Sequence, residues 1–199
     1  MNIITWLLDT DLSSLQYARG LVAPEYARLV QMAWEMVVWY WAVFLILLWL
    51  YWIWYKNNEY KKIALSIFFT IVTVFILYAI INLWIPQWRP GAIEAVHGIP
   101  PLIPHPIDNS FPSGHALFMG SLLFWIFSYF RRSWLLIVTC IVGFITLTAR
   151  VVWWVHYPGD VIAWLLFGLI GAYFLRPFVH IITSKVTPIL IKIASWIRL

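Results

Sequence analysis

Residues 34–55 read WEMVVWYWAVFLILLWLYWIWY, and Glu35 is the one formally charged residue among them. This length lies within the roughly 17 to 25 residues that an α-helix needs to cross the hydrocarbon core of a bilayer. Trp and Tyr cluster near both ends, at residues 39–41 and 49–55. Aromatic side chains gather in this way at the two membrane–water interfaces. The segment is therefore predicted to be a transmembrane helix.

The composition of the whole chain points to the same class. Hydrophobic residues make up 63% of its 199 residues, charged residues make up 11%, and the mean hydropathy is +0.85. A soluble domain of this length cannot bury so much apolar surface, so lipid must cover part of it. The single cysteine, Cys140, excludes an intramolecular disulfide, and no Cys/His spacing typical of a zinc site occurs. The sequence thus indicates an integral membrane protein without a metal or cofactor.

Four more apolar segments follow, each near the length of a span. They cover residues 63–85, 113–130, 134–148 and 161–175. We therefore expect an all-α fold, a polytopic membrane helical bundle of about five transmembrane helices. Residues 34–176 would form this transmembrane domain.

The two ends of the chain carry more charge than the spans. Residues 1–33 include Asp9 and Asp11 and are predicted to form a helix lying along the membrane interface. Residues 177–199 are apolar with sparse Lys and Arg and contain Pro188. We expect them to form a basic amphipathic tail on the cytoplasmic surface, with a sixth span as the alternative.

The charged residues divide unequally between the two sides of the membrane. Five spans place nine of the 13 basic residues on one side together with Glu59, and all other charged residues on the other side. The net charges are +8 and −3. Cytoplasmic loops are enriched in Lys and Arg, so the first side, with the C-terminus, is predicted to be cytoplasmic. We therefore attribute the net positive charge of the chain to its membrane topology and to contact with anionic lipids, rather than to nucleic-acid binding.

Two polar islands interrupt the apolar sequence. They consist of Arg89-Pro90 with Pro112-Ser113-Gly114-His115, and of Arg150 with His156 and Asp160. Ionisable residues at membrane depth are costly and usually functional. All of these residues fall at span ends on the extracytoplasmic side of the predicted topology. An amphiphilic substrate suits this place, because its head group would lie at the interface while its chain stays in lipid.

Four of these residues suit the binding of an anion. Arg89 and Arg150 carry planar, permanently charged guanidinium groups that match phosphate oxygens. Ser113 and Gly114 stand at a predicted helix start, where a hydroxyl and unpaired backbone N–H groups favour an anion. Taken singly, each arginine is equally typical of a solvated surface, and Ser113 of an ordinary helix cap.

The other three residues suit nucleophilic and acid–base chemistry. His156 and Asp160 lie four residues apart around Pro158, which is favoured in the first turn of a helix. We expect Asp160 to accept a hydrogen bond from one imidazole nitrogen and to leave the other as nucleophile. The alternative is a surface pair that only caps the helix. His115 is the natural partner that protonates the leaving oxygen and later activates water.

The order and spacing of these residues resemble the three signature motifs of the type 2 phosphatidic acid phosphatase (PAP2) superfamily. The resemblance implies a lipid phosphatase in which His156 forms a phosphohistidine that water hydrolyses without a metal. Two positions depart from the pattern. The first motif usually begins with lysine where this chain has Asn82, and the third usually has serine where it has Ala149. Asn82 is therefore a candidate replacement for one phosphate contact.

Residues 102–111, LIPHPIDNSF, together with the small size of the chain, resemble the bacitracin-resistance type of undecaprenyl diphosphate phosphatases. This resemblance implies hydrolysis of undecaprenyl diphosphate to undecaprenyl phosphate and inorganic phosphate on the outer face of a bacterial cytoplasmic membrane. Such an activity recycles the lipid carrier of peptidoglycan synthesis. In this loop, His105 and Asp108 are candidates for contact with the head group or are simply polar loop residues.

Three other functions fit the same residues. One is a related phosphatase acting on phosphatidylglycerophosphate, phosphatidate or lipid A, and another is a lipid phosphotransferase. The third is a non-catalytic phospholipid-binding protein, which would have no need of a nucleophile. The expected partners are a polyprenyl or other lipid phosphate and membrane lipids, with no nucleic acid and no obligate protein partner. No dense carboxylate cluster indicates a two-metal phosphatase site.

Overall fold

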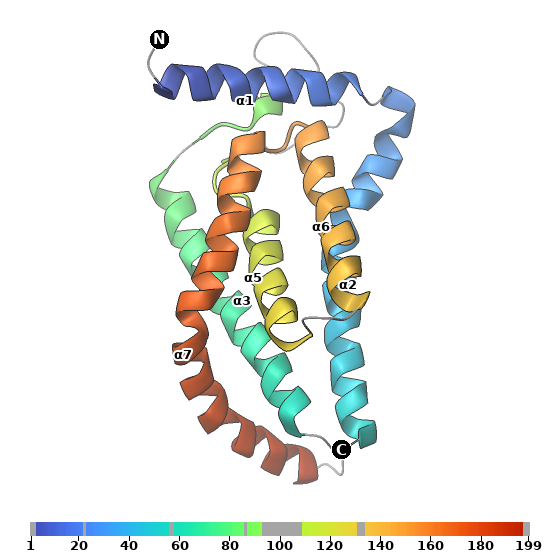
Figure 1. Cartoon of the computed structure of the whole chain (residues 1–199), viewed down its shortest axis with the longest axis vertical. Helices are drawn as coiled ribbons and strands as arrows, with labels where there is room; N and C mark the ends of the chain where they lie inside the picture. The colour runs from blue at the N-terminus through green and yellow to red at the C-terminus, as the bar shows by residue number, and fades with distance from the viewer. Residues whose placement is uncertain are drawn as a thin grey trace.

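The computed structural model describes residues 3–21, 23–55, 58–85, 87–92, 109–130 and 134–196. Its named elements are all helical: α1 (Ile3–Gly20), η1 (Pro24–Tyr26), α2 (Ala27–Tyr55), α3 (Asn58–Trp84), α5 (Gly114–Tyr129), α6 (Trp134–Val152) and α7 (Pro158–Trp196). Figure 1 shows α2, α3, α5, α6 and α7 side by side in an elongated bundle, with α1 lying across one end. The predicted all-α bundle is confirmed.

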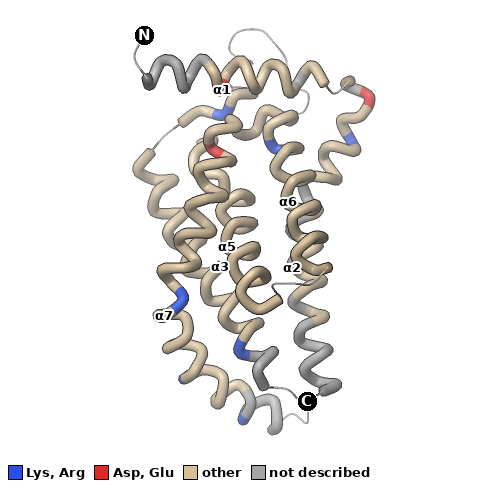
Figure 2. Tube along the Cα trace, viewed as in Figure 1, with Lys and Arg blue, Asp and Glu red and all other residues tan. Residues whose placement is uncertain are grey.

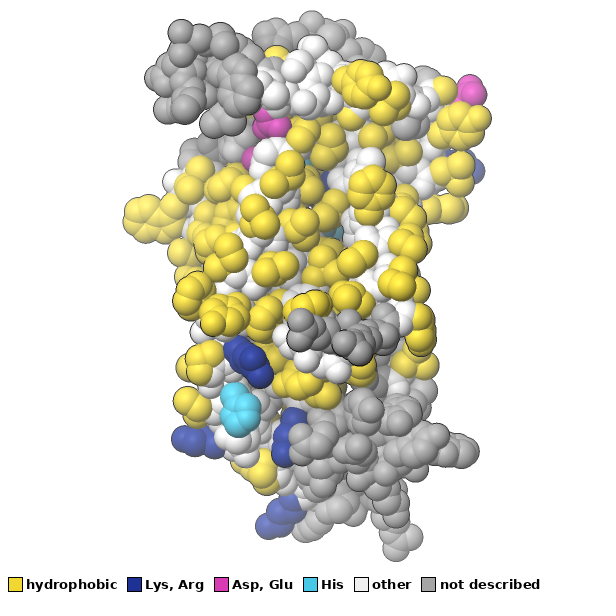
Figure 3. Space-filling view, viewed as in Figure 1, with side chains coloured by type: hydrophobic (Ala, Val, Ile, Leu, Met, Phe, Trp, Pro, Cys, Tyr) yellow, Lys and Arg dark blue, Asp and Glu magenta, His cyan; other side chains and the backbone are white. Residues whose placement is uncertain are grey.

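Three helices in the described part of the chain are long and apolar enough to cross a membrane. They are Lys62–Trp84 in α3, Trp134–Val152 in α6 and Pro158–Leu190 in α7. The apolar α5 is shorter, with 16 residues. Figure 3 shows hydrophobic side chains over the visible flank of the bundle, where lipid would lie. The chain is a multi-pass membrane protein, and the number of five spans stays a prediction.

Helix α7 continues past the point where the last span was expected to end. It has 39 residues, although Pro177 and Pro188 lie inside it. A proline inside a helix removes one backbone hydrogen bond and bends the helix, and Figure 1 shows α7 curving along its second half. Residues 177–196 are therefore a bent continuation of the last helix, and their place on the membrane surface stays a prediction.

Helix α5 packs closely on α7 and sets the position of the site. A Cβ atom added to Gly120 would overlap a backbone carbonyl of α7, and one added to Gly168 would overlap a backbone carbonyl of α5. Small residues allow such close contact between membrane helices. The Ser121 hydroxyl also donates a hydrogen bond of 3.1 Å to the Gly168 carbonyl. This packing holds the N-terminal ends of α5 and α7 beside each other.

Buried hydrogen bonds join further pairs of helices. Trp125 Nε1–H, on α5, donates to Thr70 Oγ1 on α3 at 2.9 Å. The Tyr40 hydroxyl on α2 lies 2.6 Å from Thr139 Oγ1 on α6. A polar group in an apolar interior is costly unless it is paired. These bonds therefore favour one alignment of the helices along the bundle axis.

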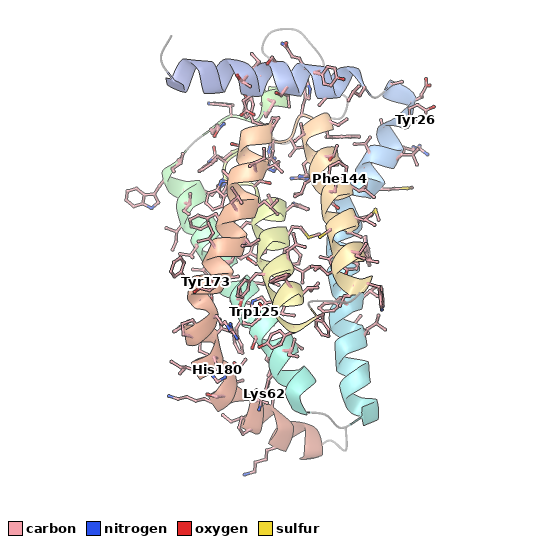
Figure 4. The ribbon with its side chains drawn as sticks, in the orientation of Figure 1. Tyr26, Lys62, Trp125, Phe144, Tyr173 and His180 are labelled. Carbon is pink, nitrogen blue, oxygen red and sulfur yellow. The ribbon has the colours of Figure 1, made fainter. Side chains whose placement is uncertain are left out.

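Charge is divided between the two ends of the bundle. In Figure 2 the coloured acidic residues lie toward the α1 end, where Lys and Arg also occur, and the coloured charged residues of the opposite half are all Lys or Arg. Figure 4 labels Lys62 and His180 near that opposite end. Within the described residues the distribution agrees with the asymmetry predicted from sequence. The assignment of the two ends to compartments stays a prediction.

Candidate active site

The described members of the two polar islands come together at the α1 end of the bundle. Arg89 Nη1–H donates to the Val155 carbonyl at 3.2 Å. Arg150 Nη2 lies 3.2 Å from His156 Nε2. These contacts join the segment after α3 to the turn between α6 and α7. Burial is extensive, since Arg89, Arg150, His156 and Asp160 are each at most 9% exposed.

The turn after α6 directs His156 back toward Arg150. The Arg150 carbonyl accepts hydrogen bonds from the N–H groups of Val155 (3.1 Å) and His156 (3.3 Å). Trp154 has a φ of 59°, a left-handed conformation that costs a non-glycine residue about 1 to 2 kcal/mol. The turn therefore reverses the chain within a few residues. His156 lies in this turn, before α7 begins at Pro158.

The start of α7 is held from two sides. Helix α7 begins at Pro158, as predicted. Asp160 Oδ2 accepts the Tyr157 N–H at 3.4 Å, as an acidic residue does at the third position of a helix. Asp11 Oδ1, from α1, accepts the Gly159 N–H at 2.7 Å. Helix α1 thus supplies a cap to the helix that carries Asp160.

Ser110 connects Asp160 to His156. Its hydroxyl donates to Asp160 Oδ2 at 2.7 Å and lies 3.4 Å from His156 Nδ1. No hydrogen bond joins His156 directly to Asp160 in the described structure, so the expected direct pair is replaced by a three-residue chain. Ser110 is fully buried, and its N–H donates to the Gln87 carbonyl at 2.6 Å.

These contacts favour one tautomer of His156. The Ser110 hydroxyl hydrogen points to Asp160, which leaves an oxygen lone pair for a hydrogen on Nδ1. A guanidinium only donates hydrogen bonds, so the nitrogen that faces Arg150, Nε2, must carry the imidazole lone pair. Burial lowers the pKa of His156 well below its ordinary 6.5, and the charges of Arg150 and Arg89 lower it further. His156 is therefore neutral near pH 7, with Nε2 as its basic nitrogen.

The start of α5 provides an anion pocket. Ser113 is the N-cap residue, but its side chain makes no capping bond, and its buried hydroxyl has no hydrogen-bond partner among the described residues. The first N–H groups of a helix have no partner within it and attract anions. His115 is half-buried in this first turn. It lies within electrostatic reach of Arg89 and Arg150. An anion bound here would meet both arginines and both histidines.

Asn82 makes its described hydrogen bonds to the segment before α5, and its predicted phosphate contact stays a prediction. The side-chain amide of Asn82 donates a hydrogen bond to the Phe111 carbonyl at 3.3 Å, and the backbone carbonyl of Asn82 accepts one from the side-chain amide of Asn109 at 2.9 Å. These bonds tie the end of α3 to the segment before α5. His105 and Asp108 lie outside the described residues, so their predicted contact with the head group stays untested. The described residues contain no group of three or more His, Cys, Asp or Glu placed to hold a metal ion.

Sequence analysis missed two residues of the site. Ser110 belongs to the loop that was quoted for its resemblance, but a serine in a loop carries no pattern that separates it from its neighbours. Asp11 is 148 residues away from Gly159 in the chain. Only the docking of α1 across the bundle end brings Asp11 to α7 (Figure 1).

Comparisons with known proteins agree with this site. The family model described as the PAP2 superfamily matches residues 63–184. The undecaprenyl-diphosphatase BcrC of Bacillus subtilis (strain 168) is 30% identical over 166 residues, which cover 77% of this chain and 79% of that protein. The bacitracin transport permease protein BcrC of Bacillus licheniformis is 42% identical over 74 residues. That second match spans 37% of this chain and only 35% of the relative.

A solved structure has the same fold. It is the crystal structure of a transmembrane PAP2 type phosphatidylglycerolphosphate phosphatase from Bacillus subtilis, with a TM-score of 0.67 over 86% of this chain and 85% of that one. The sequences are 16% identical, so this likeness concerns the fold alone. The family model covers more than half of the chain and includes every residue of the site described above except Asp11. The chain therefore belongs to the PAP2 superfamily of membrane lipid phosphatases.

Proposed function

We propose that this protein hydrolyses undecaprenyl diphosphate to undecaprenyl phosphate and inorganic phosphate, with His156 as the nucleophile. The observation that carries the proposal is the buried neutral imidazole of His156, held between Arg150 on Nε2 and Ser110–Asp160 on Nδ1. The choice of substrate rests on the two BcrC relatives. One of them is named for its action on undecaprenyl diphosphate.

Binding comes first. The terminal phosphate enters the pocket at the start of α5, where Ser113 and the N–H groups of the first turn donate hydrogen bonds. Arg89 and Arg150 neutralise its charge. Arg150 faces Nε2, so the phosphate oxygens must draw this guanidinium away before attack. The same movement exposes the lone pair of Nε2 to phosphorus.

Attack follows from this arrangement. The lone pair of His156 Nε2 forms a bond to the terminal phosphorus, and the bond from phosphorus to the bridging oxygen breaks. Undecaprenyl phosphate leaves with that electron pair. The imidazole then carries a positive charge, which the Ser110–Asp160 chain stabilises through Nδ1–H. The arginines stabilise charge on the transferring phosphoryl group.

Hydrolysis of the phosphohistidine completes the cycle. His115 removes a proton from water, the water oxygen bonds to phosphorus, and the bond to Nε2 breaks. Inorganic phosphate is released and neutral His156 is restored. In the first step His115 acts as the acid, in the reverse of its role in hydrolysis. It must first take up a proton from solvent, and the negative charge of the bound diphosphate beside it would favour this protonation. A phosphate leaving group needs less help from this acid than an alkoxide does.

The charge distribution supports an outward-facing site. The site lies at the α1 end, and the opposite half of the bundle is rich in Lys and Arg (Figure 2). By the tendency of cytoplasmic segments to be basic, that half faces the cytoplasm. The proposed location is the bacterial cytoplasmic membrane, with the site on the extracytoplasmic face.

The experiment compares substrates. Purified protein in detergent, without added metal, is given undecaprenyl diphosphate, phosphatidylglycerophosphate, phosphatidate and lipid A in parallel, and phosphate release is measured. We expect the highest kcat/KM with undecaprenyl diphosphate. His156→Ala is the control and should abolish release from every substrate. A preference for phosphatidylglycerophosphate would refute the proposed substrate, and an active His156→Ala variant would refute the proposed nucleophile.

A further inference from the structure

An apolar groove lies between α6 and α7 with α5 as its floor. Its volume is about 460 Å³, which is typical of a ligand site. Cys140, Phe144 and Val151 line it from α6, and Pro158 and Ile162 line it from α7. Helix α7 packs on α5 but makes little contact with α6, which leaves the groove open. Figure 3 shows hydrophobic side chains across this face, and Figure 4 labels Phe144.

The groove runs along the helices. Its wall on α6 comes from positions 140, 143, 144, 147, 148 and 151, which form one stripe of a helix. From Cys140 to Val151 this stripe is about 16 Å long at a rise of 1.5 Å per residue. The hydrocarbon core of a bilayer is about 30 Å thick. The groove therefore extends from the site over roughly half the depth of the apolar layer.

The upper end of the groove adjoins the reacting groups. Val151 directly follows Arg150, and Pro158 is two residues after His156. A phosphate held at Arg150 and His156 would thus lie within two residues along the chain of side chains that line the groove. Farther along the groove, Gly143 of α6 lies so close to α5 that a Cβ there would overlap the Met119 side chain.

We propose that this groove holds the part of the prenyl chain nearest the diphosphate of the substrate. The proposal rests on the proposed function, because it takes its ligand from the reaction at His156. The groove would align the chain so that the terminal phosphorus faces Nε2. Ordinary membrane phospholipid is the competing occupant, and the tests below separate the two.

The first test fills the groove. Cys140→Trp places an indole in its lower half, and Ile141→Trp, one residue away and outside the lining, is the matched control on the lipid-exposed surface. Both variants are assayed with a C55 and a C5 prenyl diphosphate, since the C5 chain is too short to reach Cys140. We expect Cys140→Trp to lower kcat/KM for the C55 substrate by about tenfold or more. A tenfold loss corresponds to about two CH₂ groups of the prenyl chain that are no longer buried in the groove. The C5 value should change by less than about twofold, within the spread of neutral surface substitutions. Equal effects on both substrates, or equal effects of the two variants, would overturn the proposal.

The second test needs no turnover. Cys140 is the single cysteine and is exposed. Its reaction rate with a membrane-permeant maleimide is measured in the inactive His156→Ala variant. We expect undecaprenyl diphosphate to slow the reaction several-fold, and the C5 diphosphate or phosphatidylcholine to leave it unchanged. Equal protection by phosphatidylcholine, or none by undecaprenyl diphosphate, would refute the groove as a prenyl site. If the wild type released no phosphate from prenyl diphosphates, the proposed function would fail while this binding result could still be read.

Discussion

Ser110→Ala tests the chain that links Asp160 to His156. The substitution removes the 2.7 Å hydrogen bond to Asp160 Oδ2 and the contact with His156 Nδ1. Asp160 then keeps the longer bond from the Tyr157 N–H. A hydrogen bond to a charged group contributes about 1.5 to 3 kcal/mol. The positive charge on His156 exists only after attack begins, so the loss falls on the transition state and not on substrate binding.

The expected effect on rate follows from this energy. About 1.4 kcal/mol corresponds to tenfold in rate, so kcat should fall by about 10- to 150-fold. KM should stay nearly constant, because Ser110 does not lie in the anion pocket formed by Ser113 and the start of α5. The assay is steady-state phosphate release from undecaprenyl diphosphate. Single-turnover formation of the phosphohistidine should slow by the same factor.

The matched control for Ser110→Ala is Ser121→Ala. Ser121 is also fully buried and also bonds across helices, to Gly168, but it lies away from the site. It should lower thermal stability and leave kcat within about twofold, as a loss confined to packing does. The reasoning would be refuted if Ser110→Ala kept the wild-type kcat. It would also be refuted if both variants lost activity only in proportion to the unfolded fraction.

Three further predictions follow from other contacts. Asp11→Ala removes the acceptor for the Gly159 N–H and should lower the free energy of unfolding by about 0.5 to 2 kcal/mol, as loss of a helix cap does. Asp11→Asn keeps an acceptor oxygen, so its thermal unfolding should show most of the wild-type stability. Equal losses of stability in the two variants would contradict the role of Asp11 as a cap. Burial lowers the pKa of His156 in the folded state. Below about pH 6.5 the unfolded chain therefore takes up a proton at His156 that the folded chain does not. The contribution of neutral His156 to the free energy of unfolding is present above this pH and is lost below it, by up to about 1.4 kcal/mol per pH unit. Unfolding of His156→Gln measured from pH 7 to 5 should lack this component, and parallel pH profiles would speak against a buried neutral imidazole. His115→Ala should slow diphosphate hydrolysis less than monoester hydrolysis, because the phosphate leaving group needs less protonation, and equal losses in kcat would count against its role as the acid.

Local properties of the sequence were enough to predict most of the helices. The apolar length of residues 34–55 and the aromatic residues at its ends indicate a span wherever that segment lies in the fold. Pro158 marks the first turn of α7 because its ring fixes a helical φ angle and it has no N–H to satisfy. The end of this helix was predicted too early, because the last span was expected to end at residue 175 and α7 continues to Trp196. Pro177 and Pro188 bend α7 without ending it, since neighbouring groups in a membrane bundle satisfy the freed backbone.

The residue types of the site were also visible in the sequence. Four polar residues lie at span ends, namely Arg89, Arg150, His115 and His156. Because successive spans cross the membrane in alternating directions, the predicted topology puts all four on the same face. Their mutual contacts were not visible, because these depend on how closely the helices approach. Gly120 and Gly168 bring α5 against α7, and that contact sets the start of one helix beside the start of the other.

By itself the sequence determined the class of protein, and it predicted which polar residue types gather at one end of the bundle. Hydropathy, charge and motif spacing are properties of the amino-acid sequence, so they can be determined without knowledge of the fold. Only the tertiary structure decided that Ser110 stands between Asp160 and His156, that Asp11 caps α7, and that a groove opens between α6 and α7. Each of these joins segments far apart in the chain. The physical reason is that side-chain packing, rather than local preference, determines which distant groups meet.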